Sequence, residues 1–352
     1  MKYSVKIGSV WGIPVELHIT FILLLIIVAF FSAYYFLLIV CLFFFVTIHE
    51  LSHSVVAKHY NIKVRKIVLY PIGGVSEIEE IPEKPGIEWR MAAAGPLVSF
   101  AVGFFLLVID QLIPIKLLFA EALPFVATAR TLIYDLAMLN LILGGFNLIP
   151  AFPMDGGRIL RALLAERMKF SDATKYAAFI GKILGILMAL FGIWYDLWLV
   201  IIGVFIYIGA TEEAESTIIS TTMARVRVKD VMYSEVASVK PETTLSEALE
   251  VMFKARYHDV LVEKDGVFQG IVTWNEILKV KQEQRSQLRV EQLPMKQISV
   301  FSDESILEAY KIMLHEKIDL VPVVERETPG KIVGVVTSES VAYAYEKAKA
   351  LR

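Results

Sequence analysis

The stretch Thr47-Ile48-His49-Glu50-Leu51-Ser52-His53 stands at the end of a run over residues 17–48 that holds no charged residue. In a helix, His49 and His53 share one face because they are four residues apart, so their two imidazoles can bind one Zn²⁺ ion. Glu50 beside them can take a proton from a water at the metal. The stretch therefore predicts a hydrolytic metal site, in a segment where ionisable groups are costly and indicate function.

Two plainer explanations are open for this motif. A helix end can simply carry polar residues where it leaves a bilayer. A His-Glu-x-x-His pattern also arises by chance in roughly one chain of this length in a hundred, so the motif needs support from the rest of the chain.

The composition predicts a membrane protein in two parts. The chain has 352 residues, of which 56% are hydrophobic, and its formal net charge is −2. Long uncharged runs continue to about Thr211, and beyond it charged residues are frequent. We therefore predict a membrane domain over residues 1–215, a linker over 216–227 and a soluble domain after it. The net charge near zero gives no reason to expect nucleic acid binding.

Residues 1–16 are a short amphipathic lead, and six apolar segments after it are predicted to cross the bilayer. The first of the six is short, and the second carries the His-Glu-x-x-His motif. The predicted spans cover residues 17–31, 34–60, 91–113, 132–149, 177–194 and 197–211.

The distribution of lysine and arginine predicts the orientation of these spans. By the positive-inside rule, both termini and the soluble domain are cytoplasmic, and the chain is a multi-pass protein of the cell membrane. The rule compares Lys116 and Arg130 on one side with the basic residues on the other, which are Lys2, Lys6, Lys63, Arg65, Lys66, Lys84, Arg90, Arg158, Arg161, Arg167, Lys169 and Lys175.

Between the second and third spans, residues 62–81 change to β-branched residues broken by glycine. This pattern predicts a small hairpin or sheet that is too polar and too short to span. It is either an ordinary connecting hairpin or, around Gly73 and Gly74, an edge strand that pairs with an extended substrate segment.

A catalytic zinc site needs a third protein ligand besides two histidines, with one position left for water. Asp155 is the best placed donor, although it can also serve as the N-cap of the helix that follows it, and both roles can hold. Asn147 stands as far into its predicted span as His49 does into its own, which indicates a similar depth. The acidic residues considered were Glu16, Glu77, Asp110, Asp135 and Asp155.

The second of two motifs in this membrane domain follows the first by about a hundred residues and reads Asn147-Leu148-Ile149-Pro150-Ala151-Phe152-Pro153-Met154-Asp155-Gly156-Gly157-Arg158. Together with His-Glu-x-x-His, it resembles the site-2 protease family of intramembrane zinc metalloproteases over roughly residues 1–215. Methionine at position 154, where family members often carry leucine, is a volume-conserving change.

The resemblance implies a set of roles for residues of the membrane domain. His49, His53 and Asp155 would hold one Zn²⁺ per chain, and Glu50 would be the general base. Asn147 would lie near the site and help to hold the substrate or to stabilise the oxyanion. The substrate would be a membrane-anchored protein, cut in or near a transmembrane segment.

The soluble part repeats a pattern of alternating strand and helix signals after about 60 residues. Gly270-Ile271-Val272-Thr273, for example, is echoed by Gly334-Val335-Val336-Thr337. The repeat predicts two packed copies of one α/β unit, over residues 228–282 and 290–348. It resembles a tandem CBS pair, a module that in other proteins binds adenine nucleotides and acts as a regulatory switch.

By this second resemblance, Thr273, Glu276 and Thr337 would contact a nucleotide. The family commonly carries an aspartate three residues after the threonine to hold the ribose, and this chain has Glu276 and Ser340 there. A pair that is purely structural, or that joins two chains as a homodimer, is the alternative.

Taken together, the sequence favours an intramembrane zinc endopeptidase whose CBS pair senses nucleotide or mediates dimerisation. The alternative from another class is a CBS-regulated membrane transporter or channel, which buried polar residues alone would suit. Transport, however, gives no reason for a glutamate fixed between two histidines at this spacing. A third class, a protein that keeps the fold and only binds membrane partners, is disfavoured by the intact Glu50.

Overall fold

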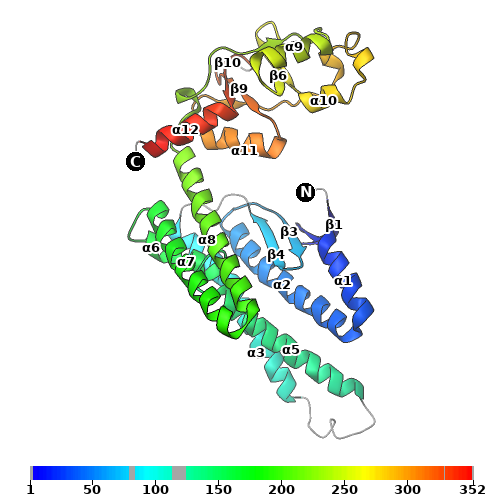
Figure 1. Cartoon of the computed structure of the whole chain (residues 1–352), viewed down its shortest axis with the longest axis vertical. Coiled ribbons are helices and arrows are strands. Elements are labelled where there is room, and N and C mark those ends of the chain that lie inside the picture. Colours follow the sequence, from blue (N-terminus) through cyan, green and yellow to red (C-terminus); the bar gives the residue numbers. More distant parts are fainter. Residues whose placement is uncertain (1–2, 79–83, 113–123, 329, 351–352) are drawn as a thin grey trace. The chain divides into compact units, whose positions relative to one another are not determined.

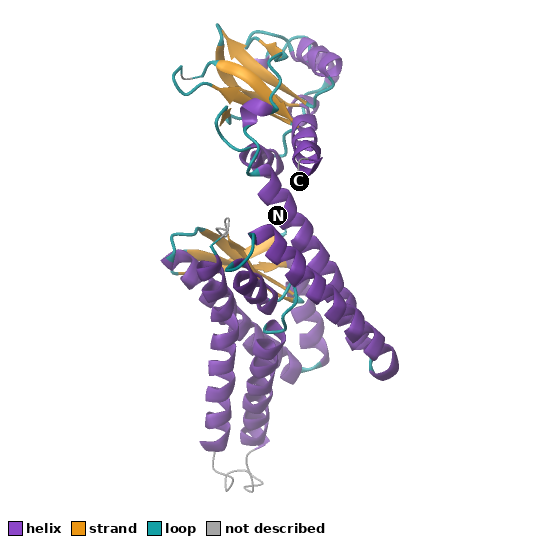
Figure 2. Cartoon of the chain, turned by 90° about the vertical axis from the view of Figure 1, so that its left-hand side faces the viewer, coloured by secondary structure: helices purple, strands orange, loops and turns teal. Residues whose placement is uncertain are grey.

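The chain folds into two compact units, which comprise Met1–Glu215 and Ser216–Arg352. The computed structural model describes residues 3–78, 84–112, 124–328 and 330–350, and Figure 1 shows the elements in chain order. The first unit combines helices with one small sheet, and the second is a mixed α/β unit (Figure 2).

Among the described residues, five helices are long and apolar enough to cross a membrane. The shorter helix α1, with 13 residues, is about 20 Å long, less than the roughly 30 Å of a bilayer core. A multi-pass helical membrane domain is thus confirmed, with a first apolar segment shorter than predicted. The described helices of this unit are α1 (Ile19–Phe31), α2 (Ala33–His59), α3 (Pro85–Leu112), α5 (Pro124–Asn147), α6 (Asp155–Ala165), α7 (Phe170–Tyr195) and most of α8 (Leu197–Met223).

A four-stranded sheet lies in the same unit, with the strand order β1-β2-β3-β4. The hairpin predicted after the second span is present as the strands β3 and β4. The segment predicted as an amphipathic lead instead forms β1 and most of β2. β2 pairs in parallel with β3, some fifty residues later, and its residues Ile13 and Val15 are buried. The strands are β1 (Ser4–Val10), β2 (Ile13–His18), β3 (Val64–Tyr70) and β4 (Gly73–Ile78).

The second unit contains the predicted repeat as two three-stranded sheets with the same topology. In each, the first strand is parallel to the second and the second is antiparallel to the third. The first copy contains β5 (Ser238–Val239), α9 (Leu245–Ala255), β6 (Asp259–Lys264), β7 (Val267–Thr273) and α10 (Trp274–Leu278). The second contains β8 (Val300–Phe301), α11 (Ile306–Glu316), β9 (Leu320–Val324), β10 (Ile332–Thr337) and α12 (Ser338–Ala350).

The two copies share a core, because Leu261 and Ile271 of the first pack with Val323 and Val336 of the second. The segment predicted as a linker, residues 216–227, is helical as far as Met223, since α8 continues past the boundary between the two units.

A buried carboxyl group lies where the two copies meet. Asp259 is 4% exposed, and its Oδ2 accepts a hydrogen bond from the backbone N–H of Asp319 at 2.6 Å. Burial raises the pKa of Asp259 to about 6, against the opposing effects of that hydrogen bond and of the charges on Lys296 and His258, whereas the charge on Asp319 adds to the increase. The folded state therefore holds a proton that the unfolded chain releases near pH 4.

This raised pKa predicts a pH-dependent stability of the second unit. Because the folded pKa exceeds the unfolded one, stability is lost as the pH rises from about 4 to about 6. Relative to wild type, an Asp259→Asn variant should gain about 2 kcal/mol between about pH 4.5 and about pH 7.5, since the amide oxygen can still accept the Asp319 N–H. Calorimetric unfolding of the full chain measures this, and an advantage independent of pH would contradict it.

Candidate metal centre

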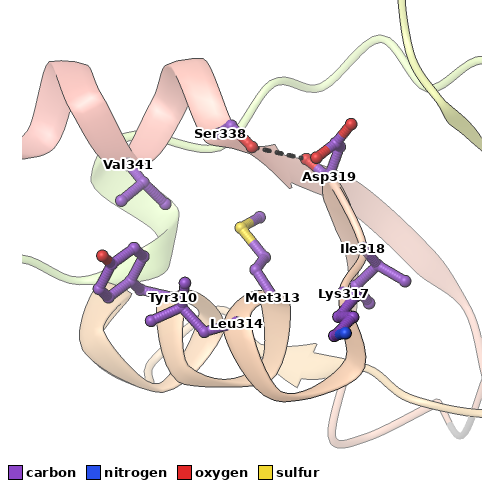
Figure 3. Close-up of a pocket in the computed structure, with 8 residues that line it drawn as sticks. All are labelled: Tyr310, Met313, Leu314, Lys317, Ile318, Asp319, Ser338 and Val341. Atoms are coloured by element: carbon purple, nitrogen blue, oxygen red, sulfur yellow. Dashed lines mark hydrogen bonds between the residues drawn. The ribbon is translucent and has the colours of Figure 1, made fainter.

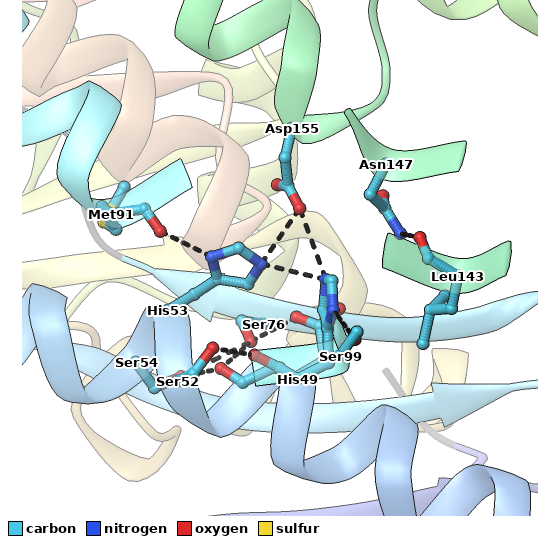
Figure 4. Close-up of polar contacts among 11 residues, drawn as sticks. His49, Ser52, His53, Ser54, Ser76, Met91, Ser99, Leu143, Asn147 and Asp155 are labelled. Carbon is cyan, nitrogen blue, oxygen red and sulfur yellow. Dashed lines mark hydrogen bonds and ion pairs between the residues drawn. The ribbon is translucent and has the colours of Figure 1, made fainter. Parts of the chain in front are cut away.

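The three predicted ligand side chains meet in the interior of the first unit (Figure 4). His49 and His53 extend from one face of α2, and Asp155 lies in the first turn of α6. Asp155 Oδ2 is 3.3 Å from His49 Nε2 and 3.2 Å from His53 Nε2, and the two Nε2 atoms are 3.2 Å apart. Both imidazoles are buried.

These separations fit a tetrahedral zinc ion. Ligands about 2.0–2.1 Å from a tetrahedral ion lie about 3.3–3.4 Å from one another. Asp155 Oδ2 is buried, and apart from the two Nε2 atoms beside it, it has no hydrogen-bond partner among the described residues. A buried carboxylate oxygen that faces two imidazole nitrogens is suited to a cation, which would compensate its charge. The N-cap alternative is not seen, because Met154 occupies the N-cap position of α6.

The outer nitrogens of both imidazoles are hydrogen-bonded to α3. His53 Nδ1 lies 2.7 Å from the carbonyl oxygen of Met91, and His49 Nδ1 lies 2.9 Å from Ser99 Oγ. A carbonyl can only accept, so His53 must carry its proton on Nδ1, which leaves the Nε2 lone pair for a metal. Such contacts orient the rings, as they commonly do around metal-bound histidines.

Gly95 allows α3 to approach both ligand nitrogens. A Cβ atom at this position would lie 2.5 Å from His49 Nε2 and closer still to His53 Nε2. Glycine is therefore required where the helix passes the two Nε2 atoms. The sequence contained a signal for this close approach, since Gly95 ends a run of small residues over 92–95, but nothing in it indicated what lies opposite.

Helix α6, which carries Asp155, is anchored by the ion pairs of a buried arginine. Arg161 is 3% exposed, and its Nε donates to Glu88 of α3 at 2.8 Å. Its Nη1 also donates to Glu213 of α8 at 3.0 Å, and its guanidinium lies over the rings of Phe152 and Phe170. Breaking such a pair leaves a buried charge without compensation, so this network holds α6 in one position. Sequence reasoning did not find it.

A cavity of about 680 Å³ contains this centre. The cavity is lined by all the candidate residues of the membrane domain, namely His49, Glu50, His53, Gly73, Gly74, Asn147 and Asp155. Asn147 Nδ2 donates to the carbonyl oxygen of Leu143 at 2.9 Å. The carboxylates that were considered as alternatives to Asp155 lie elsewhere: Glu16 and Glu77 near Lys66, Asp110 with Arg130, and Asp135 with Tyr34.

The three nucleotide candidates of the second unit make local contacts. Thr273 Oγ1 accepts the Glu276 N–H at 3.3 Å, and Glu276 pairs with Lys279 at 2.5 Å. Thr337 lies 3.3 Å from Ser340, oxygen to oxygen. A cavity of about 360 Å³ in this unit is lined by other residues, which are Tyr310, Met313, Leu314, Lys317, Ile318, Asp319, Ser338 and Val341 (Figure 3).

Comparison with known proteins identifies the family. The family model for peptidase family M50 matches residues 37–121 and 113–191, and that for the CBS domain matches residues 228–283 and 290–347. The zinc metalloprotease MJ0392 of Methanocaldococcus jannaschii is 37% identical over 350 residues, which cover 98% of this chain and 96% of that protein. This chain belongs to peptidase family M50.

Other similar proteins match smaller parts of the chain. Stage IV sporulation protein FB of Bacillus subtilis is 30% identical over 129 residues, covering 36% of this chain and 40% of that protein. The solved structure of the site-2 protease from Methanocaldococcus jannaschii is 46% identical, covers 60% of this chain and 95% of that chain, and has a TM-score of 0.44. The M50 chain is thus a zinc metalloprotease with CBS domains and a helical membrane unit, and Zn²⁺ is its cofactor.

The position of Gly95 generates a prediction for metal binding. In a Gly95→Ala variant the new methyl group would displace both imidazoles, so we expect zinc affinity to fall roughly tenfold or more. Zinc content after dialysis against graded chelator measures this in detergent-purified protein. Gly86→Ala, on the same helix but with nothing within 4 Å of its added Cβ, is the matched control and should keep its zinc. Equal zinc retention by the two variants would refute the assignment.

Proposed function

We propose that this chain is an intramembrane zinc endopeptidase, which hydrolyses a peptide bond in or near a transmembrane segment of a membrane-anchored protein. The observation that carries the proposal is the position of Glu50 beside the His49, His53 and Asp155 cluster, in one cavity of an apolar helical unit. The family match favours this function over the alternative of a CBS-regulated transporter or channel.

The residues of the cavity divide the chemistry between them. When bound, zinc polarises a peptide carbonyl and makes a water more acidic. His49, His53 and Asp155 would hold the ion. Glu50 would take the proton of the attacking water and return it to the leaving amine. Asn147, on the same cavity wall, can offer its amide to the substrate or to the developing oxyanion after exchanging its bond to Leu143.

The free edge of β4 is suited to hold the substrate in an extended conformation. β4 is the outer strand of its sheet, and Gly73 and Gly74 line the cavity. Backbone groups of an antiparallel strand point alternately toward and away from the partner. Because Tyr70 and Gly73 close the two-residue turn, Gly74 and Ser76 would direct their N–H and C=O groups away from β3. A substrate segment can add there as a further strand.

The proposal also covers the orientation of the chain in the membrane and the role of the CBS pair. The excess of lysine and arginine in the loops near the metal-site end supports a multi-pass protein of the cell membrane with both termini and the CBS pair in the cytoplasm. The CBS match supports regulation through an adenine nucleotide or through a homodimer. Thr273, Glu276 and Thr337 are the residues that we propose for the nucleotide, after local rearrangement of their capping contacts.

The proposed activity is tested with the full chain reconstituted in liposomes together with membrane-anchored model substrates. Wild type should contain about one zinc per chain and release fragments cut within or beside the transmembrane segment, as identified by mass spectrometry. Glu50→Gln should keep the zinc and lose turnover by about a thousandfold or more, because proton transfer is removed. His53→Ala and Asp155→Ala should lose both zinc and activity.

The controls separate the two function classes. A Glu50→Gln variant that cleaves as fast as wild type would exclude Glu50 as the base. A zinc-loaded wild type that cleaves none of a broad panel of substrates, together with ion flux that Glu50→Gln leaves unchanged, would favour the transporter instead.

A further inference from the structure

The carboxylate of Glu50 is hydrogen-bonded to a residue of the sheet. Ser76 of β4 donates its hydroxyl to Glu50 Oε2 at 2.7 Å, and its Oγ is also 3.4 Å from the backbone carbonyl oxygen of Glu50. Ser54 Oγ, which donates to the same carbonyl at 2.9 Å, lies 3.5 Å from Ser76 Oγ. The strand thus contacts the side chain that would act as the base.

The neighbouring residue on the same face of β4 shows how tightly the strand packs on this side chain. A Cβ atom on Gly74 would lie 2.6 Å from Glu50 Cγ and 3.3 Å from a methyl carbon of Val46. Residues 74 and 76 face the same side of the strand because side chains alternate with a period of two. Glycine at 74 lets the strand approach, and the serine at 76 then reaches the carboxylate.

Ser76 therefore contacts the base with its side chain and faces the substrate edge of the sheet with its backbone. Its side chain holds the carboxylate of Glu50, and its backbone N–H and C=O would face the free edge of β4, where an extended substrate would pair. Any substrate strand that adds to this edge would fix the backbone of the residue that orients the base. Substrate binding and the alignment of Glu50 are then linked through one short segment of chain.

We propose that Ser76 is a positioning residue for Glu50, which fixes one carboxylate oxygen so that the other is directed to the attacking water, and that a substrate strand on β4 secures this arrangement. The proposal rests on the proposed proteolytic function. Its physical basis is that a hydrogen bond to a charged acceptor in apolar surroundings is strong and directional. A freely rotating carboxylate would populate the productive orientation less often.

Kinetics of the full chain with a substrate that the wild type cleaves give the first test. Ser76→Ala should lower kcat by about tenfold to a hundredfold, the scale of a lost hydrogen bond to a charged group, with KM within about twofold of wild type. Ser76→Thr should restore kcat to within about threefold, because threonine keeps the hydroxyl and suits a strand. Ser54→Ala is the matched control. The Ser54 hydroxyl donates to the backbone of Glu50 and lies 3.5 Å from Ser76 Oγ, but it does not contact the carboxylate, so this variant should cleave like wild type.

A spectroscopic measurement tests the contact independently of turnover. The carboxylate stretching band of Glu50 is isolated as the infrared difference between each protein and its Glu50→Gln counterpart. This band should shift in Ser76→Ala and return in Ser76→Thr, with zinc content equal throughout.

The outcomes distinguish this inference from the proposed function. An unshifted band in Ser76→Ala, a kcat within twofold of wild type, or a loss that Ser76→Thr does not restore would each overturn the role of Ser76. If the band shifts in Ser76→Ala while the wild type cleaves no substrate, the contact is supported and the proteolytic function is not.

Discussion

The carboxylate of Asp155 faces the Nε2 atoms of His49 and His53 inside an apolar helical unit, where an ionised group needs a compensating charge. Much of the surrounding structure serves to keep these three groups together. Hydrogen bonds between the imidazoles and α3 orient the rings, and Gly95 leaves space beside their Nε2 atoms. Ion pairs of the buried Arg161 hold the helix that carries the carboxylate. The geometry of this cluster is thus defined by several helices at once.

Periodicity and composition predicted the parts of the fold that depend on local sequence. Four-residue spacing places His49 and His53 on one face of a helix whatever surrounds it, and long apolar runs indicated the membrane helices. The repeat predicted two similar α/β units, and the structure contains them. The conjunction of Asp155 with the histidines was different in kind: depth along the spans only made it plausible, and the family resemblance carried the expectation.

Contacts between distant segments could not be predicted from local patterns. β2 is short and pairs with β3 about fifty residues later, so the local pattern of its residues predicts only a lead and the beginning of a span. The ion pair of Arg161 could not be predicted either, because an arginine and leucine pattern does not reveal that Glu88, 73 residues away, lies opposite it. Ser76 and Ser99 gave no signal at all, since a serine becomes a positioning residue only through what the fold places opposite it.

The central claim is that His49, His53 and Asp155 form one zinc site, and X-ray absorption at the zinc edge of the purified full chain tests it most directly. The account predicts a first shell of two imidazole nitrogens and oxygen ligands at about 2.0–2.2 Å, without sulfur, and one nitrogen fewer in whatever zinc a His53→Ala variant retains. A shell with a thiolate, with three or more imidazoles, or with oxygen alone would contradict it.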